Sequence, residues 1–417
     1  MKFDTIIIGG GLAGLVSAIR LQENGQNCAI VSTGQSALHF SSGSFDLLGS
    51  LPDGEEVLNP LDAISRLDAS HPYSLIGVDA IARYDKEFPE LAKRAGVGLT
   101  GSATRNHYHF TPMGKMKRTW LTLDDFITLE SPEELPWKNI AIINFPGFLD
   151  FYTKFIADEL EKQGAKCKLA SVSLPFIEKL RANPTEMRSA NIARVFDKTE
   201  HIDALINKIS DFCKDADVVV MPAVFGLSSN EPLTYLKNHL NKPLCSLATM
   251  PPSVPGIRMQ QQLVHYFIRQ GGTFMLGDTV ERADVENGKV KAVYTVNHSD
   301  IPLCADNFIL ATGSFFSRGI IARPDSVYEP IFDLDVYYDA DRSKWYETDV
   351  FAPQNYMKFG VMTDTSFQAL CKGKVLSNLY AVGSVLSGHN ALHEGSGGGV
   401  SIMSAMYVAD SLLKKNR

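Results

Sequence analysis

Hydrophobic residues occur along this chain in two patterns, as short continuous runs and as longer stretches with helical spacing. The apolar run within 4–8 predicts a strand buried on both faces, and the stretch 12–22 predicts a helix. A second apolar run over 28–31 predicts another strand, and consecutive glycines fill the connection between the first strand and the helix. The N-terminal part therefore reads as a strand–turn–helix–strand unit with parallel strands.

The middle of the chain has an α/β rhythm of its own. Apolar runs predict strands, and amphipathic stretches predict helices over 149–163 and 231–240. The strands expected here cover 140–143, 166–174, 217–221 and 244–248. We expect residues 55–250 to form an inserted α/β cap or docking domain, and residues 1–54 plus 251–417 to form the domain that surrounds it.

The C-terminal part repeats the strand-and-turn pattern twice. A helix is predicted over 257–269, a β-meander over 279–304 with a turn at Asn287-Gly288, and strands that end at Thr312-Gly313 and at Val382-Gly383. A glycine cluster then opens an apolar helix that runs through about Leu413. These elements predict an α/β fold with a Rossmann-like parallel sheet.

The glycine-rich turn has the spacing of a nucleotide-binding fingerprint. Gly9 permits a sharp turn, Gly11 lets the backbone approach a phosphate, and Gly14 lets the helix pack against the strand. The N-terminus of the helix, at Leu12 and Ala13, offers free N–H groups and a positive dipole end to that phosphate. We expect these five residues to bind a dinucleotide or a flavin.

Two C-terminal segments favour a flavin over a nicotinamide. The turns at Thr312-Gly313 and Gly383-Ser384 follow buried strands, and the cluster from Gly397 to Val400, with Gly398 and Gly399, begins a helix. A helix dipole at that place stabilises negative charge on a reduced flavin ring. In this order and spacing the segments resemble the flavoproteins with two dinucleotide-binding domains, of the fumarate reductase and glycerol-3-phosphate dehydrogenase type.

That resemblance implies a role for one further loop, and it shows that two acidic residues expected in such flavoproteins are absent here. It implies that the loop containing Ser41, Ser42 and Gly43 brings backbone groups to the flavin ring. In those flavoproteins an acidic residue follows the second turn glycine, but this chain has Ser384. The carboxylate that usually binds the adenosine ribose at the end of the second strand is also missing, and Ser32 stands there. We therefore expect FMN as the cofactor, with FAD as the alternative.

Composition excludes several classes of function. Lys and Arg number 40 and Asp and Glu 47, and the net charge of −7 argues against a nucleic-acid binder that works through bulk charge. The six cysteines are widely spaced without a CxxC pair, so we expect reduced thiols and no metal or iron–sulfur site. No apolar run of about 18 residues is present, so we expect no transmembrane segment.

Flavin chemistry on an alcohol or acid needs a proton donor or acceptor near the flavin. His39, His389 and His393 neighbour the segments expected to contact the flavin. Arg258 stands in a first helical turn, where the dipole does not favour a cation, and could contact an anion. These four are the candidate catalytic residues, and the spacing does not choose among them.

A narrower resemblance rests on four longer stretches. Residues 34–48, 251–258 and 313–317, and residues 351–354 followed by 359–364, resemble the B subunit of the anaerobic glycerol-3-phosphate dehydrogenases. The resemblance covers essentially the whole chain. It implies a flavoprotein subunit, described with FMN, in a quinone-linked complex that oxidises sn-glycerol 3-phosphate to dihydroxyacetone phosphate. It also implies two partners: an FAD-bearing catalytic subunit, and an iron–sulfur membrane-anchor subunit that attaches the complex to the inner membrane.

This resemblance places the chain in the cytoplasm, peripherally on the inner membrane through a partner, as an electron relay. The residues agree, because without local cluster ligands or a membrane segment a flavin here needs another protein to reach quinone. Two alternatives stay open. The chain could be a self-sufficient flavin oxidoreductase of the fumarate reductase type, or a structural subunit that holds no flavin.

Overall fold

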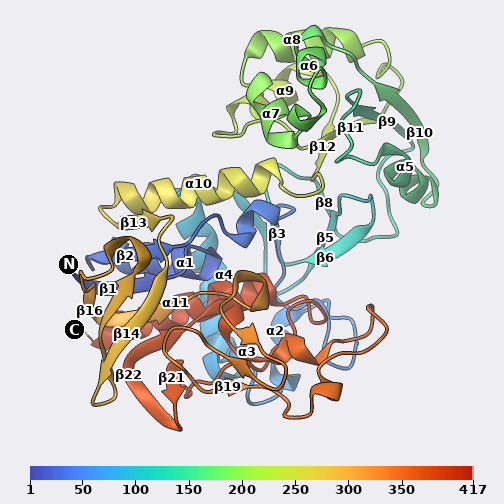
Figure 1. The fold of residues 1–417 in the computed structure, drawn as a ribbon. Helices are drawn as coiled ribbons and strands as arrows, with labels where there is room; N and C mark the ends of the chain where they lie inside the picture. The colour runs from blue at the N-terminus through green and yellow to red at the C-terminus, as the bar shows by residue number, and fades with distance from the viewer. Residues whose placement is uncertain (416–417) are drawn as a thin grey trace.

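A computed structural model of the chain describes residues 1–415 as two units. The larger contains both ends of this range, and the smaller, drawn mainly in green, lies at its upper right in Figure 1. Each unit is built around its own parallel sheet. The larger unit positions the turn glycines identified in the sequence.

The sheet of the larger unit has six strands, five of them parallel. The strand β1 (Lys2–Ile8) lies between β2 and β16 and pairs in parallel with both, with Ile6 opposite Ala29 and Phe308. β21 is antiparallel to β22 at one edge. In sheet order the strands are β13 (Thr273–Leu276), β2 (Cys28–Ser32), β1, β16 (Cys304–Leu310), β22 (Lys374–Ala381) and β21 (Gln368–Cys371). The predicted Rossmann-like α/β fold is confirmed.

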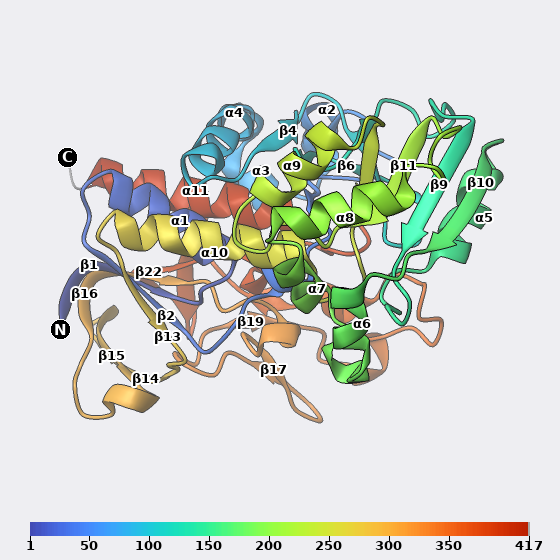
Figure 2. The same cartoon turned by 90° about the horizontal axis from the view of Figure 1, so that it is seen from above.

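Helices cover one face of this sheet. The C-terminal helix α11 (Gly397–Lys415) packs along α1 (Leu12–Glu23), and α10 (Val254–Arg269) lies on the other side of α1 (Figure 2). Both α1 and α11 are apolar over most of their surface, which suits helices enclosed between a sheet and other helices. The other helices of this unit are α2 (Pro60–Ala63), α3 (Pro72–Ile76) and α4 (Val78–Arg94).

Small antiparallel sheets of two or three strands complete the larger unit. β14 and β15 form the predicted hairpin, and Asn287 and Gly288 both have positive φ at its turn, as a two-residue hairpin turn requires. The short strands are β3 (Ser44–Phe45), β4 (Leu99–Gly101), β5 (His107–Phe110), β6 (Met116–Thr119), β7 (Leu121–Leu123), β8 (Thr128–Leu129), β14 (Val280–Glu286), β15 (Lys289–Thr295), β17 (Ile321–Ala322), β18 (Val327–Tyr328), β19 (Val336–Tyr337) and β20 (Gly360–Val361).

The smaller unit has a four-stranded parallel sheet in the order β10–β9–β11–β12. All four strands predicted in the middle of the chain are present, as β9 (Asn139–Asn144), β10 (Lys166–Ser171), β11 (Val218–Pro222) and β12 (Leu244–Leu247). Its helices are α5 (Thr153–Glu161), α6 (Pro175–Arg181), α7 (Ser189–Val195), α8 (Thr199–Ile209) and α9 (Glu231–His239).

The predicted helix over 149–163 begins later than expected. The side-chain amide of Asn144 donates to the carbonyl oxygens of Phe148 and Phe151, at 3.1 and 3.2 Å. These bonds hold the preceding segment as a loop, so α5 starts only at Thr153.

Two hydrophobic cores show how the chain is divided between the units. Residues from Val57 to Phe126 pack into the core of the larger unit, whereas the second core draws on Phe110 and on residues from Ile140 to Leu247. The division at 54/55 and 250/251 stays a prediction about folding units. The cores lead us to propose that the insertion proper begins near the end of β8.

The sequence predicts reduced cysteines and no transmembrane segment. All six cysteines are free. No helix within residues 1–415 combines the length and apolar character needed to cross a membrane.

Candidate flavin site

The turn between β1 and α1 needs glycine at two places. Gly9 has a φ of +118°, and a Cβ there would lie 2.2 Å from the carbonyl oxygen of Ala311, at the end of β16. A Cβ on Gly14 would lie 1.9 Å from the carbonyl oxygen of Gly9. The turn, the helix and the neighbouring strand therefore lie so close together that a side chain at either position would overlap a backbone carbonyl oxygen.

The space in front of the helix suits a phosphate-bearing ligand. A Cβ on Gly11, the residue that precedes α1, would meet only the Cβ of Ser36, at 3.9 Å, and one on Gly34 would meet no described atom within 4 Å. Leu12 is half-buried and Ala13 buried at the helix start. An open cradle before unpaired helix N–H groups fits the phosphate group of a flavin nucleotide.

The other two turns meet the first at the carboxyl ends of the parallel strands. A Cβ on Gly383, after β22, would lie 2.8 Å from the Cβ of Ala13, and one on Gly313 would lie 3.6 Å from the Oγ of Ser384. The hydroxyl of Thr312 is buried and has no hydrogen-bonding partner among residues 1–415. A buried hydroxyl of this kind, beside an open cradle, is the arrangement expected where a polar ligand binds.

The hydroxyl of Ser32 is used in a hydrogen bond within its own loop. Its hydroxyl donates to the carbonyl oxygen of Gly34 at 3.0 Å, and its side chain is buried. A Cβ on Gly10 would lie 2.6 Å from this hydroxyl oxygen. The close approach explains why a small side chain stands at the end of β2, and it leaves the choice between FMN and FAD a prediction.

The glycine cluster at the start of α11 packs against the segment around β3. A Cβ on Gly398 would lie 3.2 Å from that of Phe45, and one on Gly399 would lie 2.2 Å from the hydroxyl of Tyr73. The N–H of Gly399 donates to the carbonyl oxygen of Asp46 at 2.8 Å. Gly397 is half-buried and Val400 fully buried, so packing accounts for Gly399, and a flavin contact by Gly397 and Gly398 stays a prediction.

The loop from Ser41 to Gly43 is held by two other segments of the larger unit. The Ser41 carbonyl accepts a hydrogen bond from the Ser253 hydroxyl, which also caps α10, and the Ser41 hydroxyl accepts one from the Gly43 N–H at 3.1 Å. Gly43 has positive φ and lies against the ring of Phe126. Ser42, between them, is half-buried. A contact of this loop with the flavin ring stays a prediction.

One candidate histidine lies beside a buried hydrogen-bond network. His389 is fully buried and lies 6.2 Å, ring centre to ring centre, from His71, and its Nδ1 has no hydrogen-bonding partner in the described part of the chain. The Nε2 of His71 lies 3.2 Å from a carboxylate oxygen of Glu394. Because Nδ1 of His71 accepts the N–H of Tyr73, the proton of a neutral ring sits on Nε2 and is donated to Glu394.

The surroundings shift the pKa values of Glu394 and His389. Burial alone raises the pKa of the Glu394 carboxyl, but the hydrogen bonds from His71 and from the N–H of Asn390 outweigh it, so the pKa is lowered. Burial and the nearby His71 lower the pKa of His389. An ionised Glu394 and a neutral His389 therefore lie shortly before the start of α11. Sequence reasoning missed His71, because nothing local marks it.

The other catalytic candidates lie in different settings. His39 is half-buried, and burial lowers its pKa. His393 has its Nε2 3.2 Å from the carbonyl oxygen of Pro52. Arg258 is buried, pairs with Asp125 and donates to the carbonyl oxygen of Phe225 at 3.2 Å. Its guanidinium is thus used to join α10 to the smaller unit, and this pairing argues against an anion-binding role.

Buried His109 gives the fold a dependence on pH. This residue of β5 packs edge-on against Phe126, and burial, with the charge of Lys117 next, lowers its pKa from 6.5 to about 4. The unfolded chain therefore binds this proton at a higher pH than the native chain does. We expect stability to be full above about pH 6.5 and to fall towards pH 4, with His109 accounting for about 3 kcal/mol.

Denaturant unfolding between pH 7 and pH 4 measures this loss. In the variant His109→Gln the decrease on acidification should be smaller by about that amount, whatever its stability at pH 7. The exposed His239 of α9 provides a control, and His239→Gln should show the wild-type decrease. Equal decreases in all three proteins would show that His109 does not contribute.

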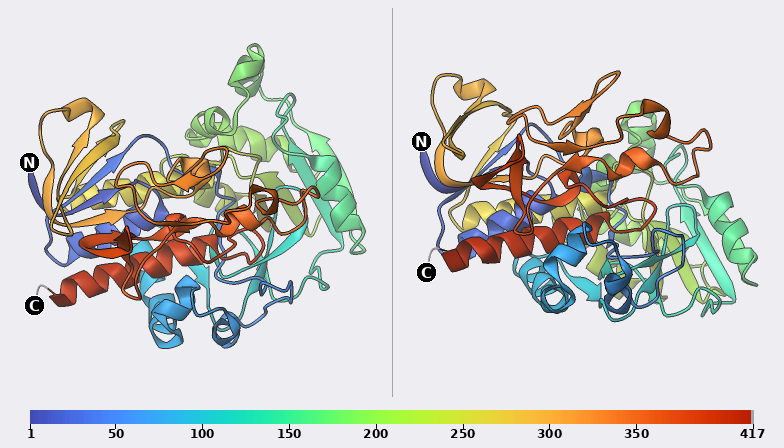
Figure 3. Two further views of the ribbon diagram at one scale, coloured as in Figure 1. Left: turned by 60° about the horizontal axis from the view of Figure 1, so that its bottom comes forward. Right: turned by 90° about the horizontal axis from the view of Figure 1, so that it is seen from below.

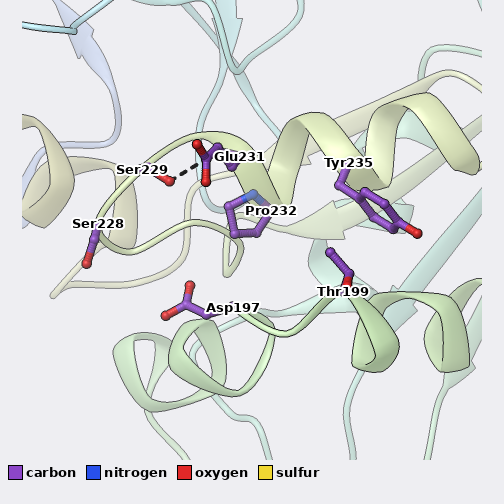
Figure 4. A pocket seen from close by; sticks show the side chains of 7 residues that line it. All are labelled: Asp197, Thr199, Ser228, Ser229, Glu231, Pro232 and Tyr235. Carbon is purple, nitrogen blue, oxygen red and sulfur yellow. Dashed lines mark hydrogen bonds between the residues drawn. The ribbon is translucent and has the colours of Figure 1, made fainter.

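A cavity of about 340 Å³ lies in the smaller unit (Figure 4). It opens between the starts of α8 and α9, and the Glu231 N–H lies 3.4 Å from the Ser229 hydroxyl at its edge. Its lining residues are Asp197, Thr199, Ser228, Ser229, Glu231, Pro232 and Tyr235. All belong to the smaller unit, so this cavity is separate from the converging turns.

Comparison with known proteins gives one family and a set of close relatives. The profile of the family described as FAD binding domain, FAD_binding_2, matches residues 4–400. A Yersinia enterocolitica protein, named as the B subunit of anaerobic glycerol-3-phosphate dehydrogenase, is 44% identical over 417 residues, which cover 99% of this chain and 98% of the relative. A Pectobacterium atrosepticum protein of the same name is 43% identical over 418 residues, covering 100% and 99%.

Solved structures show more distant likenesses. A quinol fumarate reductase chain from E. coli aligns with a TM-score of 0.44 at 10% identity, over 100% of this chain and 70% of that chain. The 3-ketosteroid delta1-dehydrogenase from Sterolibacterium denitrificans aligns with a TM-score of 0.44 at 11% identity, over 99% and 100%.

Proposed function

Because this chain belongs to the FAD binding domain family and, within it, to the family of anaerobic glycerol-3-phosphate dehydrogenase B subunits, we propose that it is the flavin-bearing subunit of a quinone-linked enzyme that oxidises sn-glycerol 3-phosphate to dihydroxyacetone phosphate. The observation that carries this proposal is the 44% identity to relatives of that name over essentially the full length of both chains.

The chain's own residues have defined tasks in this proposal. The open cradle at Gly11 and the N-terminus of α1 bind the flavin phosphate, and Thr312 offers a hydroxyl to the polar part of the cofactor. The loop from Ser41 to Gly43 and the start of α11 lie beside the ring. A bound flavin accepts two electrons and releases them singly, which is the chemistry that a relay requires.

The relay needs partners, which we propose from the names and from the site. The relatives are named as one subunit of a larger enzyme, so we propose a complex with an FAD-bearing catalytic subunit, and with an iron–sulfur subunit that anchors it to the inner membrane. In this arrangement the chain lies on the cytoplasmic face of that membrane, attached through its partner.

Release of the cofactor tests the proposal most directly. We would express the chain alone and with the two partner subunits, denature each preparation, and identify the released flavin by chromatography and mass. A flavin in the lone chain, together with glycerol-3-phosphate-dependent reduction of a quinone analogue by the complex only, is the expected result. Preparations without flavin would contradict the relay and leave a structural subunit.

The same measurement decides the identity of the flavin. FMN is proposed because Ser32 and Ser384 replace the expected carboxylates, whereas the family match favours FAD. Release of FMN supports a mononucleotide held by one phosphate at α1. Release of FAD means that the two serines are tolerated substitutions.

A further inference from the structure

An exposed apolar loop lies at the edge of the larger unit. Residues 346–353 connect the buried Trp345 with Gln354, on the side of the molecule that Figure 3 brings forward. Its large side chains are strongly exposed: Tyr346 at 59%, Val350 at 76% and Phe351 at 94%. Soluble proteins rarely expose several large apolar side chains together, and where they do, the exposed group usually marks an interaction surface.

Hydrogen bonds within the loop hold its conformation, and the side chain of Gln354 makes three of them. The amide nitrogen of Gln354 donates to the carbonyl oxygens of Asp349 and Ala352, at 2.9 and 3.0 Å. Its amide oxygen accepts the N–H of Glu347 at 3.0 Å. The loop therefore does not need its exposed side chains to fold inward, and a loop that is ordered before binding loses little entropy when a partner docks.

The base of the loop is equally well anchored. Trp345 donates its indole N–H to the carbonyl oxygen of Asp339 at 2.6 Å and packs edge-on against Phe359, with ring centres 5.6 Å apart. The guanidinium of Arg342 lies 4.7 Å from the centre of the Trp345 ring. A buried aromatic residue thus supports the exposed ones.

A second loop, between Ser384 and Gly397, contacts the apolar loop and connects two parts of the candidate flavin site. The side chain of Asn390 donates to the carbonyl oxygen of Gln354 at 3.3 Å, which joins the loop after β22 to the apolar loop. Leu392, two residues further on, is 81% exposed. This second loop begins after Ser384 and ends before Gly397, so both of its ends belong to the candidate flavin site.

The charge around these side chains is mainly negative. Between 339 and 351 the chain has four carboxylates against two cations. One cation, Arg342, stacks on Trp345, and the other, Lys344, lies 3.9 Å from a carboxylate oxygen of Asp341. Glu347 and Asp349 are exposed on the apolar loop itself. A complementary partner has an apolar centre and a basic edge.

We propose that Tyr346, Val350, Phe351 and Leu392, on two loops that the Asn390–Gln354 hydrogen bond joins, form an apolar patch. The electron-accepting partner docks on this patch, through an apolar face with a basic edge. This inference rests on the proposed relay, in which the partner must approach the flavin closely. The patch suits that task because the loop that contains Leu392 runs directly between two flavin turns.

Binding of the full chain to the purified electron-accepting subunit, without the catalytic subunit, tests this docking surface. Each of the variants Phe351→Asp and Leu392→Asp should raise the dissociation constant by about 30-fold or more, the size typical of a lost hot spot. Leu149→Asp is the matched control, because Leu149 is 76% exposed but belongs to the smaller unit, and it should bind as the wild type does. Binding should also weaken as the salt concentration rises.

Separate readouts keep this proposal distinct from the proposed function. Wild-type binding by both patch variants, equal weakening by Leu149→Asp, or no binding of the partner to the wild-type chain would each overturn the docking surface. Flavin content and absorption of the patch variants should stay at wild-type values. A chain without flavin that still loses its partner in the patch variants would refute the relay and leave the docking surface supported.

Discussion

Replacing Gly9 by alanine is expected to remove flavin binding and to destabilise the fold. The added Cβ would lie 2.2 Å from the carbonyl oxygen of Ala311, and the φ of +118° is strained for any residue other than glycine. We expect the free energy of unfolding to fall by about 2–5 kcal/mol, from backbone strain and overpacking together. Moving the turn to relieve the contact also moves the cradle in front of α1, so flavin per chain should fall well below the wild-type value.

Gly49→Ala provides the matched control for this experiment. A Cβ on Gly49 would lie 3.6 Å from the carbonyl oxygen of Glu394, an ordinary contact distance, and its backbone is not left-handed. Flavin content and the denaturant midpoint are measured for both variants. A Gly9→Ala protein with full flavin and an unchanged midpoint would show that the turn does not hold the cofactor.

Replacing Glu394 by alanine should have an effect of similar size for a different reason. Its two oxygens accept hydrogen bonds from the N–H of Asn390 at 3.0 Å, the hydroxyl of Ser396 at 3.0 Å and Nε2 of His71 at 3.2 Å. Removing the carboxylate leaves all three donors buried without this acceptor. We expect a loss of about 3–5 kcal/mol in the free energy of unfolding.

Glu394→Ala should also lower the flavin content, because the network directly precedes the glycine cluster of α11. Glu394→Gln keeps one acceptor oxygen and the side-chain volume, so it should be less destabilised than Glu394→Ala. Glu55→Ala removes a carboxylate from an exposed pair with Arg66 and should not change the denaturant midpoint measurably. Stability and flavin content that are equal in the wild type and Glu394→Ala would refute a supporting role for the network.

Arg258 shows how the two units are connected. Its buried guanidinium pairs with Asp125 and bonds to the carbonyl oxygen of Phe225 in the smaller unit. The hydroxyl of Ser253, one turn earlier, reaches the loop at Ser41. The start of α10 therefore fixes the smaller unit and a predicted flavin loop together.

Local features of the amino-acid sequence are enough to predict the scaffold of this protein. The turn at Gly9, the hairpin at Asn287-Gly288 and the parallel strands of both sheets follow from local requirements. Positive φ and continuous apolar runs depend on residues only a few positions apart, and a single sequence records them directly. The close contact between Gly9 and the carbonyl oxygen of Ala311 joins distant parts of the chain and is visible only in the fold. The roles of the turn residues towards a flavin stay a prediction on this basis.

Which polar side chains come into contact depends on how the whole chain packs. His71 and Glu394 are 323 residues apart in the chain, and Arg258 lies 133 residues from Asp125. No local pattern predicts such pairs, because the packing of whole helices and loops brings them together. The same reason explains why His389 lies beside a buried hydrogen-bond network, at 6.2 Å from the ring of His71, while His39 and His393 lie in other settings.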